Sequence, residues 1–391
     1  MPARLTSIPR GPLVVIVTAA LLLVIDDWLP DLPYLDTDFV AIVLCFAIGA
    51  AALLPLVHVG FERDRLARTA ARVLAALVAV VLSLSIALVA AEFATRWLYR
   101  NVTTTANDRG YFTRRWQRGQ PDSRNAYGFR EREFDAAKVP GVYRIAVVGD
   151  SFTYGNGLPV GQRFTNVMQQ SLPADYEVLN FGVPGHNTLD HVTTIRDTVL
   201  RLHPDFIVVQ WFVNDVEGAG LVPRPTYLPL LPFRDLNRQL SDMSAFYTLA
   251  GIWWTRWQAN WTGTTYVDFL QTNYGDPHSE GARLDRDATL ALFTICRDHG
   301  LPLGIVLFPD SGYDLGADYP FASLHRRVME ACDGAGVTCV DLRPDFATVK
   351  DRSKLWVDAL DHHPSARANT MAAARILATF SPAWTALHHH S

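Results

Sequence analysis

Two long apolar segments near the N-terminus limit how this chain can fold. Phe39–Phe61 has 23 residues without a formal charge, and Val73–Ala91 has 19. About 20 apolar residues are enough for a helix to cross a bilayer, and nothing amphipathic interrupts either run. A shorter apolar run, Gly11–Ile25, ends at Asp26-Asp27 and either spans as well or forms an uncleaved signal-like anchor. We therefore expect residues 1–99 to form a membrane region with two or three transmembrane helices.

The arginines predict the orientation of this region. The 62–72 loop between the two long segments is basic, whereas residues 26–38 contain five aspartates and neither Lys nor Arg; the arginines of the loop are Arg63, Arg65, Arg68 and Arg72. Basic loops stay in the cytoplasm. We expect a multi-pass protein of the inner, cytoplasmic membrane, with everything after residue 92 on the extracytoplasmic or periplasmic side. Phe93, Trp97 and Tyr99 suit an interfacial aromatic belt.

The rest of the chain reads as a polar linker and lead-in (100–140) followed by a domain over 141–385. In that domain apolar runs alternate with helix-like stretches; the expected strands are 143–149, 176–181, 205–213, 301–309 and 337–342, and the expected helices lie near 159–172, 188–202, 284–299, 321–335 and 365–380. Continuous apolar strands separated by helices indicate a flavodoxin-like, three-layer α/β/α fold with a parallel sheet. The net charge of −4 lacks the basic bias of a nucleic-acid binder.

Polar residues with catalytic potential follow several of these strands. Gly149-Asp150-Ser151 ends the first strand, the glycine-containing stretch Asn180–Thr188 follows the second, Asn214 follows the third, and Asp361–Asn369 precedes the last helix. The carboxyl ends of parallel strands share one edge of the sheet, where ligands bind. A serine, backbone and amide donors and a His–Asp pair are the groups that acyl transfer needs. A plain turn is the alternative for each motif taken alone.

These blocks resemble the SGNH hydrolase family, also called the GDSL family, over roughly 120–380. The resemblance is carried by Gly149-Asp150-Ser151, by Asn180 with Gly185, by Asn214-Asp215, and by Asp361 with His363-Pro364; "NAYGFRERE" (Asn125–Glu133) is similar to the lead-in of membrane-anchored bacterial members. The resemblance implies that Ser151 is the nucleophile, His363 the general base and Asp361 its orienting acid. It further implies an oxyanion hole made by the Ser151 and Gly185 backbone N–H groups and the Asn214 amide. No metal-ligand spacing is evident, and we expect no metal or other cofactor.

The orienting acid departs from the common family pattern. The family usually has its aspartate three residues before the histidine, and Leu360 occupies that place here. Asp361 is two residues before His363, a spacing similar to that of some polysaccharide-modifying relatives. Asp358 and the His362 ring are alternatives for this role.

Two further features leave alternatives open. Cys332 and Cys339 either form a disulfide in an oxidising compartment or remain free thiols. An aromatic-rich insertion at 216–283 carries a one-face stripe of Phe246, Ala250, Trp253, Trp257 and Trp261. We expect this stripe to pack on the domain; the alternative is a lid that stacks on sugar rings or rests on the membrane surface.

The sequence thus predicts a membrane-anchored serine esterase that acts on O-acyl, most simply O-acetyl, esters of envelope glycans or lipids. The first alternative is an O-acyltransferase that modifies an extracytoplasmic polysaccharide, which would need a membrane partner to supply the acyl donor. The second is a catalytically inactive, membrane-anchored binding or assembly subunit, against which the intact set of Ser151, Asn214 and His363 argues.

Overall fold

The structure is a computed structural model that describes residues 38–61, 65–105, 110–119, 124–217, 230–262 and 265–388. The chain divides into two compact units. The helical unit comprises Met1–Asn101 and Pro229–Trp253, and the α/β unit comprises Val102–Leu228 and Trp254–Ser391. The expected segment 11–25 and the acidic residues 26–37 lie outside the described residues.

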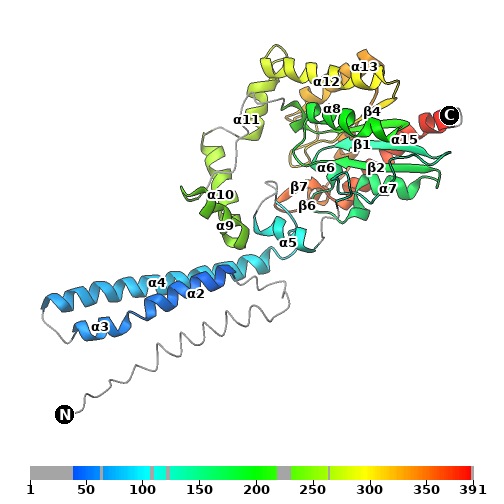
Figure 1. The fold of residues 1–391 in the computed structure, drawn as a ribbon. Helices are drawn as coiled ribbons and strands as arrows, with labels where there is room; N and C mark the ends of the chain where they lie inside the picture. Colours follow the sequence, from blue (N-terminus) through cyan, green and yellow to red (C-terminus); the bar gives the residue numbers. More distant parts are fainter. Residues whose placement is uncertain are drawn as a thin grey trace. The chain divides into compact units, whose positions relative to one another are not determined.

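The helical unit contains the two apolar segments (Figure 1). Its helices are α2 (Asp38–Ala51), α3 (Leu54–Phe61), α4 (Arg65–Leu98), α9 (Arg234–Met243) and the first half of α10 (Ala245–Thr262). Two stretches, Phe39–Val59 and Arg65–Leu98, are long and apolar enough to cross a membrane by length and composition. The first is interrupted between α2 and α3, just ahead of Pro55, because proline removes a helical hydrogen bond and its ring clashes with the preceding turn.

The helices α2 and α3 pack along α4 through a seam with a seven-residue period. The buried positions of α4 include Ala71, Val78 and Ser85, and those of α2 and α3 include Val43, Ala50 and Val57. A seven-residue spacing keeps side chains on one helix face, and small residues let helix backbones approach closely in a membrane. The remaining faces of these helices expose leucine, isoleucine and valine side chains.

The α/β unit is built on a five-stranded parallel sheet. Its strands are β1 (Tyr143–Gly149), β2 (Tyr176–Gly182), β3 (Phe206–Trp211), β4 (Leu303–Leu307) and β5 (Thr338–Asp341), in the order β2-β1-β3-β4-β5. All four strand pairings are parallel. This flavodoxin-like order confirms the predicted fold class, and it places the topological switch point between β1 and β3.

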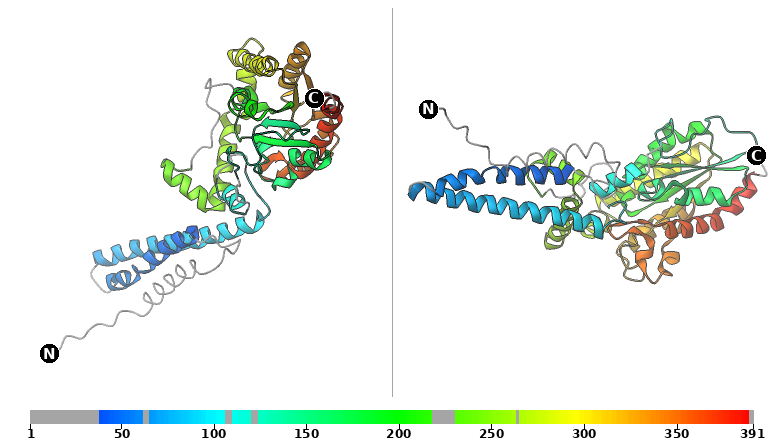
Figure 2. Two further views of the ribbon diagram at one scale, coloured as in Figure 1. Left: turned by 45° about the vertical axis from the view of Figure 1, so that its right-hand side comes forward. Right: turned by 90° about the horizontal axis from the view of Figure 1, so that it is seen from below.

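Helices cover both faces of the sheet, as Figures 1 and 2 show. One layer contains α8 (Thr188–Asp197), α12 (Glu280–Asp298) and α13 (Ala322–Ala335), and the other contains α7 (Phe164–Ser171) and α15 (Ala366–His388). Right-handed crossovers explain why the helices divide between the two faces. The chain moves from β1 to β2 toward one edge of the sheet, and after β2 it moves through β3 and β4 to β5 toward the opposite edge. Shorter helices complete the unit: α5 (Tyr111–Gly119), α6 (Ser151–Tyr154), α11 (Tyr266–Leu270) and α14 (Arg343–Ala347).

Two smaller features complete the α/β unit. Cys332 at the end of α13 and Cys339 in β5 form a disulfide, with their Cα atoms 6.2 Å apart. An antiparallel ribbon of β6 (Trp356–Asp358) and β7 (Asp361–Pro364) precedes α15. The sequence did not predict a strand at Asp361–Pro364, because these polar and turn-forming residues have little intrinsic strand preference.

Candidate active site

The turn between β1 and α6 holds the Ser151 hydroxyl at the carboxyl edge of the sheet. Asp150 caps α6 by accepting a hydrogen bond of 2.8 Å from the backbone N–H of Phe152. Gln210 on the neighbouring strand β3 accepts from the Asp150 N–H and from the N–H and hydroxyl of Thr153. Glycine is required before this turn, since a Cβ on Gly149 would collide with Thr153 and Gln210.

The β6–β7 ribbon supplies the groups that face this serine. Ser151 Oγ lies 2.7 Å from His363 Nε2, and His363 Nδ1 lies 2.5 Å from Asp361 Oδ1. The backbone N–H of His363 also donates to Asp361 Oδ1, at 3.0 Å. Asp361 and His363 are two residues apart on β7, so both side chains point to the same face of the strand. The D-x-H spacing is thus a consequence of extended backbone at this position.

The structure separates the two candidate orienting acids. The carboxylate of Asp358 accepts hydrogen bonds from other residues: the backbone N–H groups of Thr103 and Thr104, the Thr103 hydroxyl and the Leu360 N–H. Asp361, which is fully buried, contacts His363 directly. His362, the other alternative, stacks on Trp356 with ring centroids 4.2 Å apart.

Asp361 also accepts a hydrogen bond from a threonine hydroxyl that no sequence motif indicates. The Thr104 hydroxyl, buried in the α/β unit, donates to Asp361 Oδ2 at 2.5 Å. Burial by itself raises the pKa of Asp361, but the charge of His363 and the hydrogen bonds from His363 and Thr104 outweigh it and hold the pKa below its usual value. Asp361 is therefore ionised at neutral pH. Thr104 belongs to no motif, and only the folded chain reveals its role.

The predicted oxyanion donors follow β1, β2 and β3. Gly185 lies in the loop between β2 and α8 with φ = 80°, a conformation that favours glycine. Asn214 lies in the 3-10 turn after β3 (Val213–Val216) and is buried. Among the described residues, the N–H groups of Ser151 and Gly185 and the side-chain amide of Asn214 have no hydrogen-bond partner.

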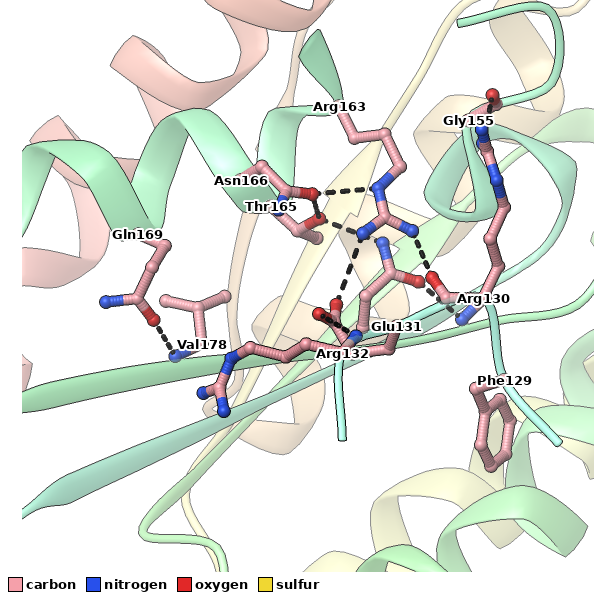
Figure 3. Close-up of polar contacts among 12 residues, drawn as sticks. Phe129, Arg130, Glu131, Arg132, Gly155, Arg163, Thr165, Asn166, Gln169 and Val178 are labelled. Atoms are coloured by element: carbon pink, nitrogen blue, oxygen red, sulfur yellow. Dashed lines mark hydrogen bonds and ion pairs between the residues drawn. The ribbon is translucent and has the colours of Figure 1, made fainter. Parts of the chain in front are cut away.

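The "NAYGFRERE" segment braces the turn that carries the serine. Figure 3 shows Arg130 reaching Gly155 and Arg163 reaching back to the lead-in. The guanidinium of Arg130 donates to the carbonyl of Tyr154, the last residue of α6, and to the carbonyls of Gly155 and Leu158 in the turn that follows. Arg163, fully buried, donates to the Arg130 carbonyl and to Glu131 Oε2 at 3.3 Å. These hydrogen bonds fix the backbone that follows Ser151.

Buried acids lie behind the site. Burial, and next the charge of Asp215, raise the pKa of Asp150 to about 6. Asp215 Oδ1 lies 2.8 Å from His191 Nε2, and neither side chain is exposed. Burial lowers the pKa of His191, but its contact with Asp215 outweighs this and raises it. At the end of β4, burial raises the pKa of Asp310 to about 6 despite the nearby His363.

Sequence comparison gives the family. Residues 147–371, more than half of the chain, match the GDSL-like Lipase/Acylhydrolase family. The chain belongs to this family. It is therefore an enzyme of a group that hydrolyses esters, and the match spans Ser151, Asn214, Asp361 and His363. No curated protein gives a significant match.

Several solved structures match about 60% of this chain at low sequence identity. A putative lipolytic protein of the G-D-S-L family from Desulfitobacterium hafniense DCB-2 is 13% identical, with a TM-score of 0.36, and covers 60% of this chain and 98% of its own. A lipase/acylhydrolase from Enterococcus faecalis is 15% identical, with a TM-score of 0.38, and covers 62% and 97%. The acetyl xylan esterase AlAXEase is 16% identical, with a TM-score of 0.39, and covers 60% and 98%.

Proposed function

We propose that this GDSL-family enzyme is a membrane-anchored serine esterase that removes O-acyl groups, acetyl being the simplest, from envelope glycans or lipids. One observation carries the catalytic part of the proposal. The Ser151 hydroxyl, the His363 ring and the Asp361 carboxylate form a continuous hydrogen-bonded path, with distances of 2.7 and 2.5 Å. A hydroxyl, an imidazole and a buried carboxylate in this order are what nucleophilic attack on an ester carbonyl needs.

In the proposed mechanism, His363 Nε2 takes the Ser151 proton as Oγ attacks the ester carbonyl carbon. The resulting oxyanion accepts hydrogen bonds from the Ser151 and Gly185 N–H groups and from the Asn214 amide. His363 then gives its proton to the leaving alcohol, and an acyl-serine remains. A water molecule, deprotonated by the same imidazole, attacks the acyl carbon. The imidazolium returns that proton to Ser151 Oγ as the bond between Oγ and the acyl carbon breaks, and the free acid leaves. Asp361 holds the Nδ1–H and stabilises the imidazolium in both steps.

The membrane part of the proposal rests on separate observations. Two stretches of the helical unit have the length and composition of membrane spans. Arginines flank the turn between them, which supports a cytoplasmic turn and an extracytoplasmic α/β unit. The Cys332–Cys339 disulfide supports an oxidising compartment for that unit. A phosphatase that is active only outside the cytoplasm, fused after residue 388, should be active; an inactive fusion at normal expression would contradict this orientation.

A fluorophosphonate probe tests the catalytic proposal on the full chain in detergent. The wild type should be labelled covalently and Ser151→Ala should not, while Ser171→Ala, which removes an exposed hydroxyl on α7, serves as the matched control and should be labelled like the wild type. Equal labelling of the Ser151→Ala variant would overturn the assignment. No labelling of the wild type would favour the inactive-subunit alternative.

The substrate is tested on the same preparation with esters of increasing acyl length and with an O-acetylated polysaccharide. Release of acetate into water supports the esterase. Appearance of the acyl group on an added, unacylated glycan would instead identify an acyltransferase.

A further inference from the structure

Helix α10 exposes four tryptophans. Trp253, Trp254, Trp257 and Trp261 are 63%, 41%, 54% and 78% exposed. The expectation that this stripe packs on the domain is wrong for its three tryptophans, because the helix buries its other face through Ala245, Thr248, Gly251 and Ile252. Four large aromatic side chains on one helix are costly to leave in water and indicate a binding surface. We call these four residues the tryptophan face.

The first turn of α10 is attached to the end of α4. The Glu92 carboxylate, which is 1% exposed, accepts hydrogen bonds from the Ser244 hydroxyl at 2.6 Å and from the backbone N–H groups of Ala245 and Phe246, both at 3.0 Å. Arg96, one turn later on α4, donates to the same carboxylate at 2.6 Å. Glu92 thus caps α10 with an anion at its positive end, and every one of these contacts lies within the helical unit.

The position of Glu92 along α4 determines where the first turn of α10 lies relative to the apolar span of α4. Glu92 directly follows the uncharged run Val73–Ala91, so it lies where the apolar span ends. The last turns of α4 expose Phe93 and Trp97, residues typical of the boundary between lipid tails and headgroups. The first turn of α10 therefore starts at the level of that boundary.

The chemistry of α10 favours a lipid surface over a glycan. Ala245–Thr262 contains no acidic residue, and the exposed polar neighbours of the tryptophan face are Arg256 and Asn260. Tryptophan and arginine without acids are typical of helices that lie in a membrane interface. The tryptophan rings also cover one another: Trp254 stacks on Trp257 with centroids 5.2 Å apart, and Trp257 lies 5.7 Å from Trp261. A sugar ring needs an aromatic face that is open.

We propose that the tryptophan face of α10 inserts into the headgroup region of the bilayer that α4 crosses. The proposal rests on the membrane anchoring proposed above, and it is independent of the catalytic assignment. In this arrangement Glu92 fixes where α10 enters the interface, and the tryptophans hold it there.

Fluorescence quenching by brominated lipids tests this on the full chain in nanodiscs. The test variant is W253F/W254F/W257F/W261F, because phenylalanine keeps the face apolar and the helix folded. Trp384→Phe, which removes a fully buried indole in the α/β unit, is the matched control. Bromines near the headgroup should quench wild-type emission more than bromines near the bilayer centre. The quadruple variant should lose most of the quenched emission, and the control should keep it.

Three results would overturn the proposal. Equal quenching of the wild type and the quadruple variant would mean that the tryptophan face lies outside the lipid. An unquenched tryptophan face whose emission shifts when an O-acetylated xylo-oligosaccharide is added would identify a glycan surface instead. Labelling by the fluorophosphonate probe is measured in parallel, because Ser151→Ala should lose labelling and keep the quenching. Failure of the chain to enter nanodiscs would refute the anchoring itself, whatever the labelling result.

Discussion

Replacement of Asp361 by asparagine tests the catalytic geometry most sharply. In the Asp361→Asn variant the side-chain oxygen can still accept from the backbone N–H and Nδ1–H of His363, while the new amide NH₂ faces the Thr104 hydroxyl, which can rotate to accept it. The ring therefore keeps its tautomer, and the variant loses chiefly the negative charge beside the imidazolium. For charge centres about 4 Å apart in a partly screened site, that charge is worth about 4 kcal/mol, or about 10³-fold in rate.

The assay is kcat/KM for hydrolysis of a short aryl ester, measured at a temperature where all variants are folded. Asp361→Asn should fall about 10³-fold, less than the ~10⁴-fold loss found where an asparagine imposes the wrong tautomer. Asp358→Asn is the matched control. Its single amide oxygen can accept from Thr103 and Thr104 or from the Leu360 N–H, but not from both sides, so the change should cost about 2 kcal/mol of stability but less than about ten-fold in activity. A larger activity loss for Asp358→Asn than for Asp361→Asn would refute the assignment.

Three further variants test other parts of the structure. Asn214→Ala removes one proposed oxyanion donor and should lower kcat about 10²–10³-fold in the same ester assay; an unchanged kcat would remove Asn214 from the site. Gly155→Ala places a Cβ against the buried Arg163 side chain at φ = 78° and should lower the free energy of unfolding by about 3 kcal/mol in urea titrations. Asp285→Asn should stabilise the protein above pH 6, because burial raises the pKa of Asp285 to about 6. In the unfolded chain Asp285 ionises near pH 4, whereas in the folded protein it does so only near pH 6, so the wild type loses stability as the pH rises. The Asp285→Asn variant should therefore gain at most about 3 kcal/mol in the free energy of unfolding, and this gain should disappear below pH 4. A gain that does not depend on pH would contradict this explanation.

Most of the sheet could be predicted from the sequence because its strands are buried on both faces. Continuous apolar runs such as 143–149 and 176–181 indicate buried strands of a parallel sheet when helical stretches separate them. The order of strands also brings Ser151 and Asn214 to one edge, so their proximity follows from the fold class. The two apolar segments of the helical unit are equally plain, since length and lack of charge define them.

The features that the sequence did not predict depend on contacts between distant residues. Thr104 lies 257 positions from Asp361, and nothing in the run Thr103-Thr104-Thr105 distinguishes the threonine that contacts Asp361. The β6–β7 ribbon is held by pairing and by the packing of Trp356 on His362, and the β7 residues Asp361–Pro364 have little strand preference. The exposure of the tryptophan face was mispredicted because a one-face stripe indicates burial without identifying what covers it.

The ribbon that carries His363 also carries an identical side chain immediately before it. His362 occupies the opposite face of β7 and stacks on Trp356. If β7 slipped by one residue against β6, His362 would turn toward Ser151, but the residue two positions earlier would then be Leu360, which has no carboxylate. The slipped enzyme would possess an imidazole without a counter-charge. The Trp356–His362 stack and the Asp358–Thr103 contacts thus favour the register of β7 that places His363, and not His362, beside Ser151.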